Sequence, residues 1–461
     1  MLSNQYLEAI LDYGSSKGAD YVEVFYEETA KNILTVIGER VANCSYGTDC
    51  GVGIRLFFGN EVLYIHSSDS QEKNVFARMK QQLENFQNSR LVNDEQKVIQ
   101  SMNLQSDYQI APSDWSMDQK MKLVQKAIHA GRAVDSRIVQ GKVHYIDFDQ
   151  KVQIANTLGQ NLTDHRIKTR MLFTMFAEDE SDSQSSYYGP GAMKGLEFYH
   201  QIDVEECARR AARDALNLLH AKPCPIGQMP VVIGNGFGGL FFHEACGHSL
   251  EASQVRNNGS EFSNLLGEQV ASSKVTLVDD GSIPGEWGTL SCDDEGEHTR
   301  KNVLIENGVL KSFLVDRYHA KLLGLEPTGS ARRENYRFAP TSRMTNTYIA
   351  PGKDSFEDMI ASVEKGIYVK SINAGSVNSA TGEFNFNTGE TFLIENGVIR
   401  CPVRSATLIG RGGDILKKVE MVGNDYQMGQ GFCYAKSGAL FIGAGQPSVK
   451  VSKMTVGGGE A

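Results

Sequence analysis

The stretch Leu240-Phe241-Phe242-His243-Glu244-Ala245-Cys246-Gly247-His248 joins an apolar helical start to two histidines and a glutamate. Two imidazoles can hold a zinc ion, and a carboxylate beside one of them can take a proton from metal-bound water. In the common motif the histidines stand at i and i+4 and share one helix face. Here they stand at i and i+5, roughly 140° apart around a regular helix. A π-turn or other widened turn would bring the rings together, and Gly247 favours such a distortion. The stretch therefore predicts a deformed helix with a metal site on its functional face.

The composition of the chain excludes several classes of protein. Its 461 residues suffice for two or more domains, and 41% apolar and 22% charged residues are ordinary for a soluble globular protein. The net charge of −10 disfavours nucleic acid or an anionic membrane as the main partner, because phosphate binding needs a basic face. The N-terminus lacks a basic and apolar leader, and no apolar run reaches the length of a membrane span. We therefore expect a cytoplasmic protein.

Apolar periodicity predicts helices alternating with antiparallel strands in the first half of the chain. We expect separate strands at 21–26 and 33–41 and again at 143–148 and 151–156, with polar connections at 87–106 and 181–191. Pro223-Cys224-Pro225 marks the best domain boundary, and strands dominate after it. The expected fold class is α+β. An N-terminal domain of helices and antiparallel sheet covers residues 1–222. A strand-rich C-terminal domain over 223–461 carries the metal-motif helix.

Two local patterns predict backbone geometry. The hexapeptide Leu-Ile-Glu-Asn-Gly-Val occurs at 304–309 and 393–398, and Asn-Gly between apolar strands predicts a tight hairpin at each. The glycine-rich stretch 234–239 lacks the Lys-Ser/Thr ending of a phosphate-binding loop. We interpret it as a strand-to-helix turn at which another backbone comes close.

Catalytic zinc needs a third protein ligand, and the residues alone leave three candidates. Glu251 lies three residues after His248, Asp293 and Asp294 lie in an acidic loop, and Cys433 follows a glycine-rich segment. A thiolate suits zinc because the metal deprotonates it and the bond is short. If Glu251 is not a ligand, it can orient an imidazole N–H as an outer partner. The remaining cysteines, which form no CxxC pair, are expected to be free and mostly buried.

Cationic and acidic residues elsewhere are weaker candidates. Arg332 and Arg333 could bind a peptide carboxylate or steady a developing oxyanion, although ordinary ion pairs are equally expected. The acidic loop around Asp293, Asp294 and Glu295 could line the cleft or be solvated.

Several further blocks of sequence carry a family resemblance. They comprise Gly236-Phe237-Gly238-Gly239, Ser249-Leu250-Glu251, Val278-Asp279-Asp280-Gly281, Asp293-Asp294-Glu295-Gly296, Arg332-Arg333-Glu334, Asn346-Thr347-Tyr348, Ala406-Thr407-Leu408-Ile409-Gly410, Met421-Val422-Gly423-Asn424-Asp425 and the segment from Gly443 to Pro447. Together with the His-Glu motif, these blocks resemble the TldD/PmbA family on its TldD side. The resemblance is dense over residues 225–461 and diffuse before them.

The resemblance implies a zinc metalloprotease that cleaves unfolded or short peptides. It implies His243, His248 and Cys433 as metal ligands, since Cys433 matches the family's C-terminal cysteine, and Glu244 as the base that activates zinc-bound water. Tyr434-Ala435 after Cys433 departs from the family's shorter step. The resemblance also implies a homodimer, or a heterodimer with a PmbA/TldE-like subunit that lacks the motif.

Two other functions remain open. One is a non-catalytic peptide-binding or regulatory protein of the gyrase-modulator type, which would not need Glu244. The other is a metal-dependent hydrolase acting on a non-peptide amide.

Overall fold

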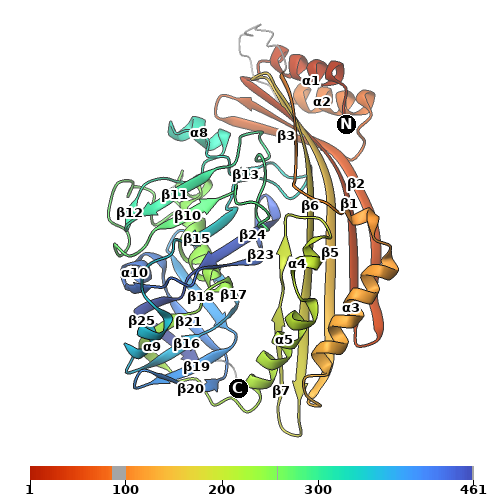
Figure 1. Cartoon of the computed structure of the whole chain (residues 1–461). Helices are drawn as coiled ribbons and strands as arrows, with labels where there is room; N and C mark the ends of the chain where they lie inside the picture. Colours follow the sequence, from red (N-terminus) through yellow and green to blue (C-terminus); the bar gives the residue numbers. More distant parts are fainter. Residues whose placement is uncertain (86–99, 257, 459–461) are drawn as a thin grey trace.

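The structure is a computed structural model that describes residues 1–85, 100–256 and 258–458. Its N-terminal half is built around four long antiparallel strands (Figure 1). They are β1 (Tyr21–Ile37), β2 (Arg40–Phe58), β5 (Ile138–Asn156) and β6 (Gln160–Glu178). The eight-stranded sheet has the order β3-β2-β1-β5-β6-β4, and β7 and β8 also pair with β6. The shorter strands are β3 (Glu61–Ser67), β4 (Gln100–Gln105), β7 (Ser183–Tyr188) and β8 (Gly191–Ala192).

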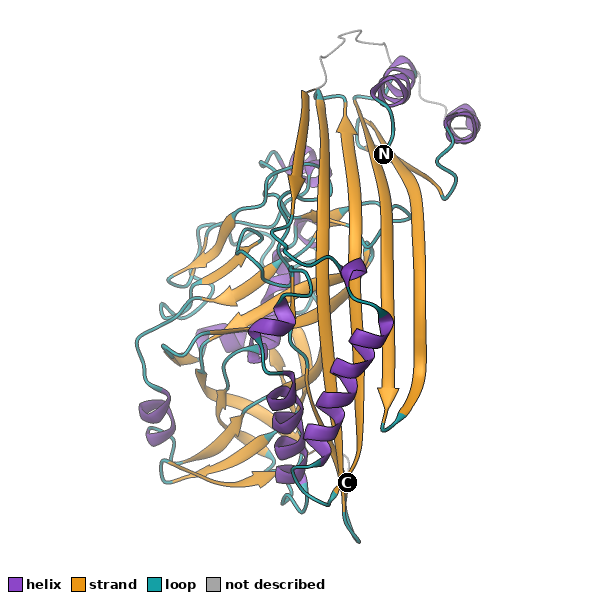
Figure 2. Ribbon diagram, turned by 45° about the vertical axis from the view of Figure 1, so that its right-hand side comes forward, coloured by secondary structure: helices purple, strands orange, loops and turns teal. Residues whose placement is uncertain are grey.

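Helices cover this sheet at two places. Near one end lie α1 (Asn4–Ser16) and α2 (Glu72–Asn85), and Leu7 and Ile10 of α1 are in one core cluster with Val22. Farther along, α3 (Met117–Arg132), α4 (Phe198–Gln201) and α5 (Val204–Leu218) lie against the long strands (Figure 2). The alanine-rich seam of α5 packs with α3 and the sheet because small side chains let helix and strand come close.

The C-terminal half contains the metal-motif segment and three further sheets (Figure 1). A nine-stranded sheet has the order β17-β18-β21-β25-β9-β16-β19-β20, with β22 on β25, and a six-stranded sheet has the order β12-β11-β10-β15-β24-β23. The strands are β9 (Gly227–Ile233), β10 (Leu277–Asp280), β11 (Lys301–Glu306), β12 (Val309–Leu310), β13 (Ala331–Arg332), β14 (Thr341–Ser342), β15 (Asn346–Ile349), β16 (Lys365–Val369), β17 (Ile372–Val377), β18 (Glu383–Thr388), β19 (Thr391–Glu395), β20 (Val398–Val403), β21 (Ala406–Arg411), β22 (Val419–Val422), β23 (Gln427–Ala435), β24 (Gly438–Gln446) and β25 (Val449–Gly458). The helices are α6 (Leu240–Phe242), α7 (Ala252–Val255), α8 (Arg317–Leu323), α9 (Phe356–Ala361) and α10 (Gly412–Lys417).

The α+β class is confirmed, and both Asn-Gly hairpins are present. Asn307 and Asn396 have φ of 48° and 52°, and the glycine after each also has positive φ, as such turns require. The division into domains 1–222 and 223–461 stays our proposal. It is supported by sheet membership, because β1 to β8 form one sheet and the other three sheets use strands from β9 onward.

Strand lengths and two connections were predicted wrongly. The expected strand at 21–26 continues to Ile37 in β1, whereas the expected strand at 33–41 is broken by the turn at residues 38–39, after which β2 begins. The expected strands at 143–148 and 151–156 are continuous in β5, where Asp149 and Gln150 stay in register with β1 and β6. Ser183–Tyr188, expected as a connection, is β7. Gln100–Gln105 is β4, whereas residues 87–99 of that expected connection lie outside the described residues. In the described part of the chain, no helix is both long and apolar enough to cross a bilayer.

Candidate metal centre

The motif lies on a π-helical turn, as its spacing predicts. His243–Gly247 is π-helix, and the N–H of His248 donates to the C=O of His243, five residues earlier. The wider turn reorients the second ring, so the two imidazole centroids lie 5.1 Å apart. Gly247 has ordinary helical angles, with φ of −57° and ψ of −48°. A Cβ there would lie 2.2 Å from Met344 Sδ, so the glycine is favoured by close packing against a side chain and not by an unusual backbone angle.

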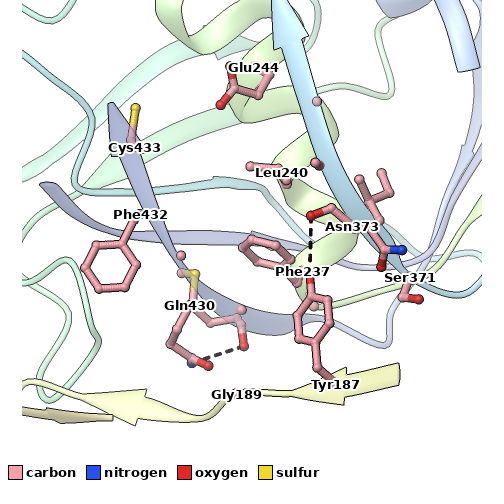
Figure 3. A pocket seen from close by; sticks show the side chains of 18 of the residues that line it. Tyr187, Gly189, Phe237, Leu240, Glu244, Ser371, Asn373, Gln430, Phe432 and Cys433 are labelled. Atoms are coloured by element: carbon pink, nitrogen blue, oxygen red, sulfur yellow. Dashed lines mark hydrogen bonds between the residues drawn. The ribbon is translucent and has the colours of Figure 1, made fainter. Parts of the chain in front are cut away.

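Four potential ligand atoms converge beside this turn. One donor atom each from His243, Glu244, His248 and Cys433 lies within 4.8 Å of the others, and we call these residues the metal cluster. Cys433 Sγ is 3.2 Å from His248 Nε2, and a Glu244 carboxylate oxygen is 3.6 Å from the same nitrogen. Cys433 comes from β23, so one strand completes a group begun by the π-turn (Figure 3).

His243 has an environment that a metal ion would satisfy. Its side chain is fully buried, and among the described residues neither ring nitrogen has a hydrogen-bond partner. A buried polar atom without a partner costs about 1–3 kcal/mol, so native proteins rarely leave one in place without a reason. Two imidazoles and a thiolate are also the donor types that zinc prefers over oxygen-binding metals. The residues present therefore fit a zinc ion.

Glu251 contacts the opposite side of His248. Its carboxylate is 3.2 Å from Nδ1, whereas Nε2 faces Cys433 and Glu244. One imidazole nitrogen can bind a metal while the other donates to a carboxylate that fixes the ring. This arrangement favours a role for Glu251 in orienting the His248 ring over a role as a metal ligand.

Arg343, which sequence reasoning missed, links the two halves of the metal cluster. It is 1% exposed and donates to the C=O of Cys433 at 2.9 Å and to Ser437 Oγ at 2.8 Å. Its Nε lies 3.8 Å from the Glu251 carboxylate. Arg343 therefore ties the β23–β24 turn to the segment that follows His248. No local pattern in the sequence marks it, because its partners are distant along the chain.

Electrostatics set different protonation tendencies within the cluster. Burial lowers the pKa of His243 well below its usual value, with His248, Arg343 and Arg332 adding to the effect, so the imidazole is neutral and able to bind a metal. Burial also raises the pKa of Glu244, and Glu251 adds to this while His248 opposes it. Burial alone would lower the pKa of His248, but Glu251 and Cys433 raise it well above normal. Glu244 thus has the more basic carboxylate that a proton acceptor needs.

The metal cluster opens into a cavity of about 850 Å³. Glu244, His248 and Cys433 line it together with residues of β7, β17 and β23. β17 ends the nine-stranded sheet and β23 ends the six-stranded sheet, so two sheet edges face one cavity. Between them the glycine-rich turn supplies Phe237, followed by Leu240 (Figure 3). The turn also brings backbones together as predicted, since a Cβ on Gly239 would lie 2.5 Å from the backbone of Gly445.

Family models match most of the chain. The model described as PmbA/TldA metallopeptidase domain 1 matches residues 22–83, the central-domain model 110–219 and the C-terminal-domain model 226–458. The chain belongs to the PmbA/TldD family. The metal cluster lies within the part matched by the C-terminal model.

Relatives of this PmbA/TldD chain are named as metalloproteases. Metalloprotease TldD homologs from Buchnera aphidicola (subsp. Acyrthosiphon pisum) and Haemophilus influenzae are 32% and 33% identical. The first alignment covers 95% of this chain and 93% of the relative, and the second covers 99% and 97%. A Saccharolobus solfataricus protein named zinc metalloprotease TldD homolog is 33% identical over 56% of this chain and 58% of its own length.

Solved structures share the fold. A Thermotoga maritima protein, described as a candidate modulator of a DNA gyrase, superposes with a TM-score of 0.78 at 24% identity, covering 98% of this chain and 99% of its own. TldE from Thermococcus kodakarensis gives a TM-score of 0.77 at 20% identity, covering 98% and 100%. Because both identities are low, the two structures show only that the PmbA/TldD chain shares their fold.

Arg332 and Arg333 lie outside the metal cluster and are only 2% and 4% exposed. Arg332 donates to the carbonyls of Met344 and Phe441, whereas Arg333 binds the Glu23 carboxylate at 2.6 Å and the carbonyl of Asp294. Their expected contact with substrate stays a prediction, and the geometry gives both a role in holding segments of the chain together.

The acidic loop is likewise engaged away from the metal cluster. Asp293 accepts the backbone N–H groups of Glu295, Glu297 and Ala331, and Asp294 pairs with Arg166 at 2.7 Å. Glu295 is fully buried and pairs with Arg55. The structure therefore does not bring Asp293 or Asp294 to the two histidines, and among the sequence candidates the remaining donor there is Cys433.

Proposed function

We propose that this chain is a zinc metalloprotease that hydrolyses unfolded or short peptides. The observation that carries the proposal is the convergence of His243, Glu244, His248 and Cys433 at a cavity, with both nitrogens of buried His243 unpaired. The name of the Saccharolobus relative supports zinc in particular. A cytoplasmic location stays a prediction from the sequence.

The protein residues divide the work. His243, His248 and Cys433 would hold the ion, and Glu251 would fix the His248 ring through Nδ1. A bound zinc ion supplies a Lewis acid that polarises a carbonyl and acidifies water. Glu244 accepts the proton of the attacking water on its carboxylate and then delivers it to the amine that leaves. Its raised pKa suits both steps, because a group that is too acidic would accept a proton poorly.

The cavity supports an extended peptide as substrate. The terminal strands β17 and β23 both line it, and a peptide can add to such an edge through main-chain hydrogen bonds. Main-chain recognition depends little on side-chain identity, so we expect loose sequence preference. A folded protein cannot present such a strand, which favours unfolded or short peptides.

We expect the chain to be a dimer, either with itself or with a TldE-like subunit. The family resemblance and the structural likeness to TldE support this expectation. Sedimentation of the purified chain, alone and mixed with such a subunit, tests it. A stable monomer that cleaves peptides would contradict it.

The proposed function is tested by measuring zinc content and peptide cleavage on the same purified protein. Purified chain should contain about one zinc per subunit and should cut an unfolded casein or a peptide library. Chelation should remove both properties, and added zinc should restore both. Zinc without cleavage of any peptide would favour the regulatory alternative, and cleavage confined to non-peptide amides would favour the other hydrolase.

A further inference from the structure

Two side chains of the N-terminal sheet donate hydrogen bonds to backbone carbonyls of β23 and β17, two of the strands that line the cavity. Arg170 on β6 donates through Nη2 to the C=O of Gln430 on β23, at 2.7 Å. Tyr187 on β7 donates its hydroxyl to the C=O of Asn373 on β17, at 3.3 Å (Figure 3). Both side chains line the cavity that also contains the metal cluster.

The register of β23 shows that the Gln430 carbonyl belongs to the edge that faces the cavity. Gln430 lies opposite Gly443 of β24, and Gly443 donates its N–H to Thr345, away from β23. Opposed residues of an antiparallel pair either bond each other or point away from each other, in alternation. The backbone groups of Gln430, and therefore of Phe432 and Tyr434, point away from β24.

Arg170 is held firmly at this position. Its Nε donates to the C=O of Gly189 at 3.0 Å, and its guanidinium lies 5.5 Å from the ring centre of Phe432 and 5.8 Å from that of Trp287. Two directed hydrogen bonds and two aromatic faces oppose displacement by an incoming peptide. Because Arg170 holds the Gln430 carbonyl, the part of the β23 edge that a peptide can pair with begins after Gln430 and reaches the metal cluster at Cys433.

We propose that Arg170, assisted by Tyr187, ends the peptide-binding edge and limits the substrate segment on that side of the cut bond to about three residues. A strand rises about 3.4 Å per residue, so the three steps from Gln430 to Cys433 span roughly 10 Å. A peptide paired with this edge has about three residues between the metal cluster and the guanidinium. Arg170 is therefore a specificity-determining residue, and this inference rests on the proposed protease function.

The test measures fragment lengths from an unstructured peptide of about twenty residues by mass spectrometry. Wild type should accumulate end fragments of about three residues. Arg170→Met keeps an unbranched side chain but loses both hydrogen bonds, so the short fragments should fall at least several-fold and longer ones should replace them. Tyr187→Phe should cause a smaller shift in the same direction. Arg213→Met, an exposed residue of α5 paired with Glu206, is the matched control and should leave the lengths unchanged.

The outcomes separate this inference from the proposed function. If wild type cuts no peptide, the proposed function fails. If wild type cuts but produces no excess of short fragments, or if Arg170→Met gives the same lengths, the limit set by Arg170 is wrong. Arg170→Lys retains the charge but has a single donor nitrogen that cannot reach both carbonyls as the guanidinium does, so it should give an intermediate length profile. If Arg170→Met and Arg170→Lys both lower the melting temperature but leave the fragment lengths unchanged, Arg170 only joins the N-terminal and C-terminal halves of the chain, and the inference is overturned.

Discussion

Two buried polar groups in this molecule differ in how their charges are satisfied. The ionic cluster, formed by Glu23, Arg55, Arg166, Asp294, Glu295 and Arg333, joins β1, β2 and β6 to the C-terminal half through paired opposite charges. The metal cluster contains His243, which is equally buried and has no hydrogen-bond partner among the described residues. Burial by itself is therefore a poor sign of function.

The difference shows where a ligand is needed. In the ionic cluster the protein itself supplies the countercharges, although Arg55 Nε and Arg333 Nε have no hydrogen-bond partner among the described residues, so the effect of this cluster is structural. In the metal cluster two imidazoles, a thiol and a carboxylate come together, a donor set that a metal ion would stabilise. Variants in the two clusters should accordingly separate stability from chemistry.

The largest effect is expected for Glu244→Gln. The amide keeps the shape of the side chain but cannot accept the proton, so peptide cleavage should fall by roughly 10²- to 10⁴-fold. Zinc content and melting temperature should stay close to wild type, because Glu244 is assigned a proton-transfer role and not a ligand role. Parallel loss of zinc would show that this assignment is wrong.

Arg333→Met should unfold the protein more easily without altering the site. Glu23 and the Asp294 carbonyl would lose a buried partner, which costs about 3–5 kcal/mol of the free energy of unfolding. Denaturant titration measures the loss, and Glu23→Gln in the same chain should recover part of it. Arg337→Met, which breaks an exposed pair with Asp49, should cost less than about 1 kcal/mol. A change in KM with unchanged stability would restore Arg333 as a substrate-binding residue.

Cys433→Ala should weaken zinc binding by more than the roughly 100-fold that an orienting residue can account for. The thermal stabilisation that zinc gives to wild type should shrink together with affinity, because binding to the folded state alone stabilises it. X-ray absorption of the wild type should show sulfur at about 2.3 Å from the metal. A shell of nitrogen and oxygen only would exclude Cys433 as a ligand.

The smallest effect is expected for Glu251→Gln. The amide can still face His248 Nδ1 but lacks the charge, so zinc affinity should fall by about 10- to 100-fold while the ion still binds. Calorimetric titration with competing chelator measures the change. A loss as large as that of Cys433→Ala would make Glu251 a ligand.

Local patterns in the sequence predicted what depends on local spacing. The i, i+5 histidines predicted the π-turn, and Asn307-Gly308 and Asn396-Gly397 predicted hairpins through their backbone angles. Cys433 was one of three candidate third ligands from the residues alone, and the family resemblance favoured it over the other two. Arg343 and β7 were missed for a common reason. Arg343 acts through Glu251 and Cys433, each about ninety positions away, and β7 depends on a neighbouring strand. The polar sequence of Ser183–Tyr188 carries no apolar alternation.

The position of β25 has a consequence for biosynthesis. This strand is the last one described, yet it lies in the middle of the nine-stranded sheet, paired with β9 directly before the motif and with β21. A growing chain on the ribosome exposes the two histidines long before β23 and β25 exist to complete their surroundings. If the chain has the proposed peptidase activity, that activity can therefore arise only after β23 has been made and has folded against the π-turn, so the segments made before β23 do not meet a complete site.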